Sequence, residues 1–304
     1  MVHGEHVGQP LHELITEARV GRMDFDRQST RDLVGLMNAH DTAVPEAVAA
    51  EADAIAAAID AIVLRLGRGG RLVYVGAGSS GRIAELDAGE CEATFSTEPG
   101  QVVALVAGSD LQSPSEREGA EDDADQGRRA VRELGLSPED VVVGVSASGR
   151  TPYALGALEA AAAAGAMTVA LVSVPDSELA RVAEHELAIV VGPEFIAGST
   201  RLKAGTAQKL VLNTISTVAM IRLGKTYGDL MVDVRASNEK LAARARSIVR
   251  LATGASDEEV EEALADADGS AKVAVVSLLA RVNACEARAL LDRVGGRIGS
   301  ALEQ

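Results

Sequence analysis

The sequence predicts an α/β fold, a three-layer sandwich on a five-stranded parallel sheet, followed by a small C-terminal helical bundle. Apolar, Val-rich runs recur between residues 72 and 191, and helix-like segments separate most of them. Continuous apolar strands that alternate with helices are typical of a parallel sheet covered on both faces. Beyond Asn238 the pattern is charged and helical, with no strand candidate.

The elements follow from their apolar patterns. A weak helical pattern covers residues 30–38. A long helix is expected over 45–67, because Pro45 stands at its start, apolar residues recur on one stripe and Gly67 follows. A second long helix is expected over 202–223, and about three short helices beyond residue 238. The predicted strands are Leu72–Val75, Val102–Val106, Val141–Val145, Thr168–Val172 and Leu187–Val191.

These elements indicate three parts: an N-terminal helical segment (1–61), an α/β ligand-binding domain (62–225) and a C-terminal helical domain (226–304). Aromatic residues make up 2 % of the chain and hydrophobic residues 47 %, so the core must be built from Ala, Val, Leu and Ile.

Charge and cysteine content exclude several classes of partner. A net charge of −16 argues against nucleic acid and against an anionic membrane surface as partners. Cys91 and Cys285 form neither a disulfide framework nor a metal-ligand spacing. The N-terminus has no apolar signal core, and the apolar stretch 154–174 is interrupted by Glu159 and Gly165. We therefore expect a cytoplasmic protein.

A glycine-rich turn follows the first predicted strand. The run from Gly76 to Gly81 satisfies G-x-G-x-x-G, the dinucleotide fingerprint. An acidic residue should end the second strand to hold a ribose, but the nearest one, Asp110, is too far along the chain. The motif alone is weak evidence, and we favour another phosphate over a dinucleotide.

A second turn of the same kind follows the third strand. Residues 146–152 read SASGRTP, a hydroxyl-rich turn with Pro at the first helical position. Backbone amides at a helix start, together with hydroxyls, suit a compact phosphate monoester. The alternative is that these serines and threonines only cap helices.

At this point the residues resemble a known family. The two serine turns on a parallel sheet are similar to those of the sugar isomerase (SIS) domain. Several blocks resemble the N-acetylmuramic acid 6-phosphate etherase family within it. They are VGAGSSGRIAELDAGEC (75–91), EGAEDD (118–123), DVVVGVSASGRTPY (140–153), GSTRLKAGTAQKLVLNTIST (198–217) and DLMVDVRASNEKL (229–241). The resemblance covers nearly the whole chain.

The resemblance implies a lyase that eliminates the D-lactyl ether of an amino sugar 6-phosphate and then adds water. It places the catalytic residues on Glu90, the acid, and Glu121, the base at C2. We expect Glu90 just past the helix that follows the first turn. Without the resemblance, Glu121 stands in a charge run typical of a solvated helix face. Phosphate and sugar ligands are expected at Gly78, Ser79, Ser80, Ser146, Ser148, Gly149, Thr151, Ser199, Arg201 and Lys203.

Elimination beside an aldehyde needs no redox cofactor, and no metal-ligand spacing is present, so we expect neither metal nor cofactor. The resemblance also implies a sugar-phosphate substrate and a homodimer. Two alternatives stay open. One is a non-catalytic sugar-phosphate-binding regulator, which would not need Glu90 and Glu121. The other is an aldose–ketose isomerase, which would not need an acid for the C3 oxygen.

Overall fold

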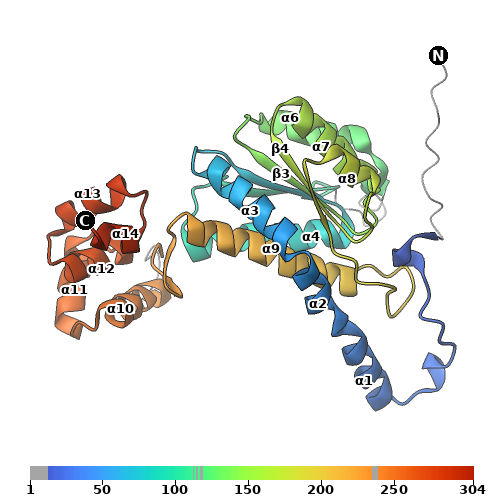
Figure 1. The fold of residues 1–304 in the computed structure, drawn as a ribbon, viewed down its shortest axis with the longest axis horizontal. Coiled ribbons are helices and arrows are strands. Elements are labelled where there is room, and N and C mark those ends of the chain that lie inside the picture. Colours follow the sequence, from blue (N-terminus) through green and yellow to red (C-terminus); the bar gives the residue numbers. More distant parts are fainter. Residues whose placement is uncertain (1–12, 112, 114–115, 117–118, 235–238) are drawn as a thin grey trace.

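The computed structural model of the chain describes residues 13–111, 113, 116, 119–234 and 239–304 (Figure 1). Its centre is a five-stranded sheet in the order β2-β1-β3-β4-β5, and every neighbouring pair is parallel. The strands are β1 (Leu72–Gly76), β2 (Val102–Val106), β3 (Val141–Ser146), β4 (Met167–Val172) and β5 (His185–Ala188). The predicted fold class is confirmed.

Helices cover both faces of the sheet, as Figure 1 shows. Successive strand residues point to opposite faces. Tyr74 and Val143 pack with α3 (Ala52–Leu66), α4 (Gly78–Phe95) and α9 (Lys203–Arg222). Val73 and Val142 pack on the other side with α6 (Ala124–Leu134), α7 (Pro152–Ala163) and α8 (Glu178–Val182). Two apolar layers therefore enclose the sheet.

The last strand differs from the prediction. β5 pairs with β4 over His185–Ala188, whereas the sequence pattern predicts residues 187–191. Ile189 and Val191 are buried all the same, as part of the apolar cluster under α3 and α9. An apolar run indicates which residues are buried, and here the buried residues continue past the end of the strand at Ala188.

The N-terminal part is a chain of short helices. Two 3-10 turns, η2 (Ile15–Glu17) and η3 (Phe25–Arg27), precede α1 (Thr30–Asp41), which Ser29 caps. The single helix predicted over 45–67 is two, α2 (Ala43–Ala50) and α3, because Glu51 departs from helical geometry with φ −97° and ψ 13°.

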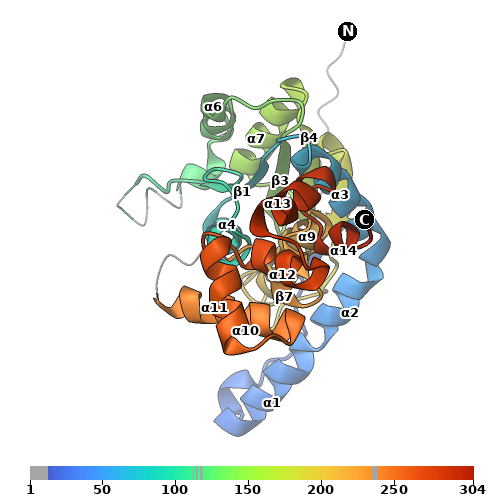
Figure 2. The same ribbon diagram turned by 90° about the vertical axis from the view of Figure 1, so that its left-hand side faces the viewer.

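The C-terminal helices form a second body with its own apolar cluster, seen in front in Figure 2. A two-stranded hairpin, β6 (Thr226–Tyr227) and β7 (Leu230–Met231), leads to it. The prediction of about three helices is too low, because the described residues form five. They are α10 (Glu239–Thr253), α11 (Asp257–Asp266), α12 (Ala271–Ala280), α13 (Ala284–Arg293) and α14 (Ile298–Leu302). Ser256, Ser270 and Asn283 cap three of them, and the boundary at Asn283 separates α12 from α13 without a glycine. The three-part division of the chain stays a prediction.

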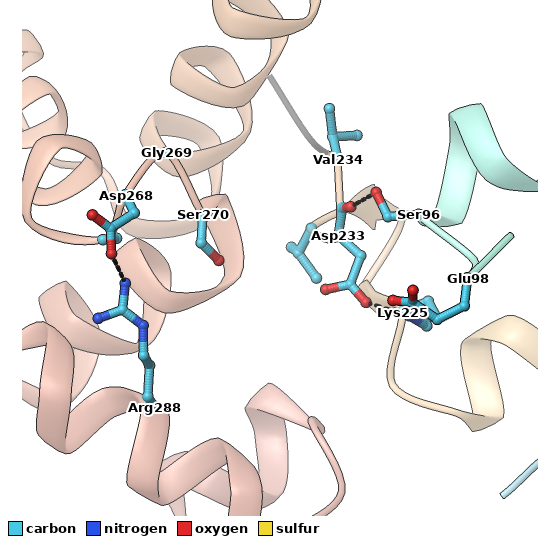
Figure 3. Close-up of a pocket in the computed structure, with 11 residues that line it drawn as sticks. Ser96, Glu98, Lys225, Asp233, Val234, Asp268, Gly269, Ser270 and Arg288 are labelled. Carbon is cyan, nitrogen blue, oxygen red and sulfur yellow. Dashed lines mark hydrogen bonds and ion pairs between the residues drawn. The ribbon is translucent and has the colours of Figure 1, made fainter. Parts of the chain in front are cut away.

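A cavity of about 670 Å³ lies where this bundle meets the sheet domain (Figure 3). Asp233 stands at the joint and pairs with Lys225 at 3.1 Å and with Lys272 of α12 at 2.6 Å. Ser96, the residue that ends α4, donates a hydrogen bond to the Asp233 carbonyl. The end of α4 is thereby tied to the bundle. Within the described residues, no helix has the length and apolar character needed to cross a membrane.

Candidate active site

The first serine turn joins β1 to α4 at the carboxyl edge of the sheet, where ligands bind in parallel sheets. α4 begins at Gly78, whose φ of +54° favours glycine. At Gly81, a Cβ would lie 2.7 Å from Val106 Cγ1 and 2.8 Å from the Gly76 carbonyl oxygen. The G-x-G-x-x-G spacing is thus explained by close packing of α4 on two strands.

The second serine turn joins β3 to α7 and is organised around a buried hydroxyl. Ser146 Oγ lies 2.8 Å from Thr151 Oγ1 and accepts a hydrogen bond from the Gly149 amide at 3.0 Å. Ser148 Oγ lies 3.5 Å from Ser146 Oγ. Gly149 has φ +66°, and a Cβ there would lie 2.1 Å from Ser177 Oγ. The turn therefore gathers three hydroxyls in a fixed backbone.

Glu121 lies beside the first turn. It is in a 3-10 turn, η4 (Ala120–Asp122), that packs against α7, the helix that starts at the second turn. Its Oε2 is 3.9 Å from the position that a Cβ on Gly78 would occupy. The side chain is exposed. The fold thus brings the predicted base to the serine turns.

Glu90 lies elsewhere. The expectation that it stands just past the helix is wrong, because α4 continues to Phe95. Glu90 is twelve residues after Gly78 in that helix, which is about 18 Å along its axis. Its side chain is 65 % exposed, with Oε2 3.7 Å from Lys209 Nζ on α9. Within one chain, the two glutamates are therefore on different parts of the surface.

The three anion-site residues predicted around the start of α9 lie in different environments. Arg201 is exposed, and Ser199 is partly exposed. Lys203 is 3 % exposed, and its Nζ donates to the Val191 carbonyl after β5. Burial lowers the pKa of Lys203, although the nearby Glu194 and Asp41 carboxylates oppose this shift. Glu194 also accepts hydrogen bonds from the backbone amides of Lys203 and Ala204, both at 2.9 Å. These contacts fix the start of α9 and explain the burial of Lys203 without a ligand.

Comparisons with known proteins cover nearly the whole chain. Residues 54–162 match the family model described as glucokinase regulatory protein N-terminal SIS domain, and residues 132–217 match the SIS domain model. An N-acetylmuramic acid 6-phosphate etherase from Streptomyces avermitilis is 55 % identical over 303 residues, which cover 99 % of this chain and 97 % of that protein. One from Rubrobacter xylanophilus is 56 % identical over 96 % of this chain and 97 % of the relative.

The chain belongs to the N-acetylmuramic acid 6-phosphate etherase family.

A solved structure supports the fold. A phosphoheptose isomerase from Neisseria gonorrhoeae is similar with a TM-score of 0.50 and 19 % identity, covering 63 % of this chain and 98 % of that one. The regulator and isomerase alternatives are not favoured, because the relatives that match nearly the full length of this chain are named N-acetylmuramic acid 6-phosphate etherases.

Two charged residues beside Glu90 were not among the predicted site residues. Asp87, one turn earlier on α4, is 4 % exposed and accepts a hydrogen bond from the buried Tyr74 hydroxyl at 3.0 Å. Lys209 Nζ is 3.5 Å from Asp87 Oδ1. The available signal was that Lys209 and Asn213 share one face of the helix 203–222 at i, i+4 spacing, a pattern that packing or interface residues show equally well. Across the described ranges, no group of three or more His, Cys, Asp or Glu side chains is arranged to hold a metal.

Proposed function

We propose that this protein cleaves the D-lactyl ether of N-acetylmuramic acid 6-phosphate, giving N-acetylglucosamine 6-phosphate and D-lactate in amino sugar catabolism. Family membership over nearly the whole chain supports this activity. The structural observation that carries it is the approach of Glu121 to the Gly78 turn, which sets a carboxylate beside a phosphate-type loop.

The serine turns hold the 6-phosphate in this proposal. Ser146, Ser148 and Thr151 gather their hydroxyls at one edge of the sheet, and Ser79 and Ser80 stand in the first turn of α4. Helix N-termini present unpaired backbone amides, which attract anions. Local amides and hydroxyls of this kind offset the unfavourable net charge of −16.

Glu121 acts as the base. In the open-chain sugar, the C2 hydrogen is next to the C1 aldehyde, so its removal leaves electrons that the carbonyl oxygen accepts. The C3–O bond then breaks, and its electron pair leaves with the lactyl oxygen, which takes a proton from Glu90. Water adds to C3 of the unsaturated aldehyde, giving its proton to Glu90, while C2 regains one from Glu121. A positioned acid or base of this kind contributes about 10²–10⁴-fold in rate.

The two glutamates meet across a homodimer. Within one chain, about 18 Å of helix α4 separates Glu90 from the Gly78 turn, too far for both residues to contact one sugar. Leu86, Gly89 and Glu90 form an exposed face of α4, with Leu86 51 % exposed. An apolar groove of about 480 Å³ also runs between α3 and α9. We propose that Glu90 of the partner subunit completes each site.

The free cysteines agree with a cytoplasmic location.

A direct assay tests the activity. The protein is mixed with N-acetylmuramic acid 6-phosphate, and free D-lactate is measured, with Glu121→Gln as the comparison. We expect lactate from the parent protein and a loss of about 10²–10⁴-fold in the variant. Asp122→Asn, an exposed carboxylate in the same 3-10 turn, is the matched control and should keep the parent rate. A Glu121→Gln variant that releases lactate at the parent rate contradicts the assignment.

A further inference from the structure

Lys209 stands between two carboxylates of helix α4. Its Nζ is shielded from solvent and, within the described residues, has no hydrogen-bond partner. It lies 3.5 Å from Asp87 Oδ1 and 3.7 Å from Glu90 Oε2. A shielded ammonium is costly unless negative charge surrounds it. The lysine is therefore held by both carboxylates together.

The inner carboxylate is anchored to the sheet. Asp87 is 4 % exposed, and its Oδ2 accepts a hydrogen bond from Tyr74 on β1. Burial, followed by the Asp87 charge, raises the pKa of Tyr74 well above its ordinary value, so the phenol keeps the proton that it donates. A connected series of polar contacts thus runs from the buried strand through Asp87 and Lys209 to the surface.

The outer carboxylate has no comparable support from burial. Glu90 is 65 % exposed, and an exposed glutamate samples many rotamers. Its contact with a shielded cation restricts these rotamers, because moving away leaves the ammonium with one carboxylate.

We propose that Lys209 is a positioning residue for Glu90, itself anchored by Asp87 and Tyr74. The proposal rests on the catalytic role of Glu90 proposed above. Lys209 holds the carboxylate where it reaches the ether oxygen, and it compensates the charge that develops when the proton leaves. It does not take part in removal of the C2 proton, because that step belongs to Glu121.

A double-mutant cycle on the full chain tests this. Lactate release is measured for the parent, Lys209→Met, Glu90→Gln and the double variant. We expect Lys209→Met to lower kcat about tenfold to hundredfold in the parent background. In the Glu90→Gln background, the same change should alter kcat less than about twofold, since its partner is already gone. Lys209→Arg, which keeps the cation, should restore part of the rate.

A second readout separates positioning from general damage. In deuterated water, Lys209→Met should keep C2 exchange near the parent rate while lactate release falls, because Glu121 still works. Loss of fold or of substrate binding would lower both. Lys272→Met, which removes a buried lysine from Asp233 away from Glu90, is the matched control and should keep the parent kcat.

The outcomes distinguish the two proposals. If the parent protein releases no lactate, both the function and this inference fail. If it does release lactate but the two substitutions multiply their effects, or C2 exchange falls with lactate release, only the role of Lys209 is overturned.

Discussion

Glu121 Oε2 lies 3.9 Å from the point where a Cβ on Gly78 would stand, so the proposed base and the first serine turn share one space. In the sequence, the rest of helix α4, strand β2 and the loops on either side of β2 separate the two residues, and the sheet brings them together at its carboxyl edge. A larger side chain at Gly78 should therefore contact the Glu121 carboxylate.

Gly78→Ala should damage activity more than stability. The φ of +54° strains an alanine by about 1 kcal/mol, and its methyl group fills the space between the turn and Glu121. We expect kcat/KM for lactate release to fall about tenfold or more. Steady-state kinetics and urea unfolding measure the two effects.

Gly135→Ala is the matched control. Gly135 ends α6 with φ +59°, and nothing lies within 4 Å of a Cβ there. It should lose similar stability without losing activity. Equal activity losses in both variants would show that backbone strain alone explains the effect at Gly78.

Ser148→Ala should weaken binding of the phosphate. Its hydroxyl is partly exposed, and its side chain accepts from the Arg150 amide at 3.3 Å, so the turn can persist without it. A hydrogen bond to a charged group contributes about 1.5–3 kcal/mol, so KM should rise about tenfold or more. The comparison is competitive inhibition by N-acetylglucosamine with and without its 6-phosphate. An equal loss of affinity for both sugars would place Ser148 away from the phosphate.

Arg71→Met should destabilise the fold at the edge of the sheet opposite the serine turns. Arg71 pairs with Asp140 at 2.7 Å, just before β1 and β3. Burial by itself raises the pKa of Asp140, but hydrogen bonds from the Arg71 side chain and from the Ser137 and Arg71 amides bring it below its ordinary value. Removing one partner of a buried pair costs about 3–5 kcal/mol, which urea unfolding at pH 7 measures.

The pH dependence of that loss has a definite sign. Because the folded pKa of Asp140 is depressed, its stabilisation is complete above the unfolded value of about 3.9 and disappears as the pH falls through the lower folded value. The difference between parent and Arg71→Met should therefore be greatest at neutral pH and shrink below about pH 4. A difference that is independent of pH would rule out the charge of Asp140 as its source.

The sheet was predictable because buried parallel strands are continuous apolar runs, and Val141–Ser146 is buried at every position. The same rule misplaced the last strand, since β5 ends at Ala188 while Ile189 and Val191 beyond it are still buried. The Ile189 amide still donates a hydrogen bond to the Val172 carbonyl of β4 at 2.8 Å. The break at Glu51 is a change of backbone angles within an Ala-rich helical pattern, which no side chain announces.

The serine turns were visible in the sequence because glycine, serine and the following helix are contiguous. The position of Glu90 was not, because the helix was expected to stop before residue 90, whereas α4 continues to Phe95. The Lys209 contacts were also hidden, since they join residues more than a hundred positions apart. Pairing of that kind depends on how α4 and α9 pack, which a single sequence does not contain.

A mixture of Glu90→Gln and Glu121→Gln proteins should regain activity if each site takes one glutamate from each subunit. Each variant alone lacks one group at both sites of its homodimer. In a mixed dimer, one site lacks both groups and the other has both. After equal amounts are denatured and refolded together, about a quarter of the parent activity should return. Size-exclusion chromatography checks that dimers form, and parent protein taken through the same refolding sets the scale. If the dimers exchange subunits but lactate release stays at the level of the single variants, the glutamates do not act across the interface, and the proposed shared site is wrong.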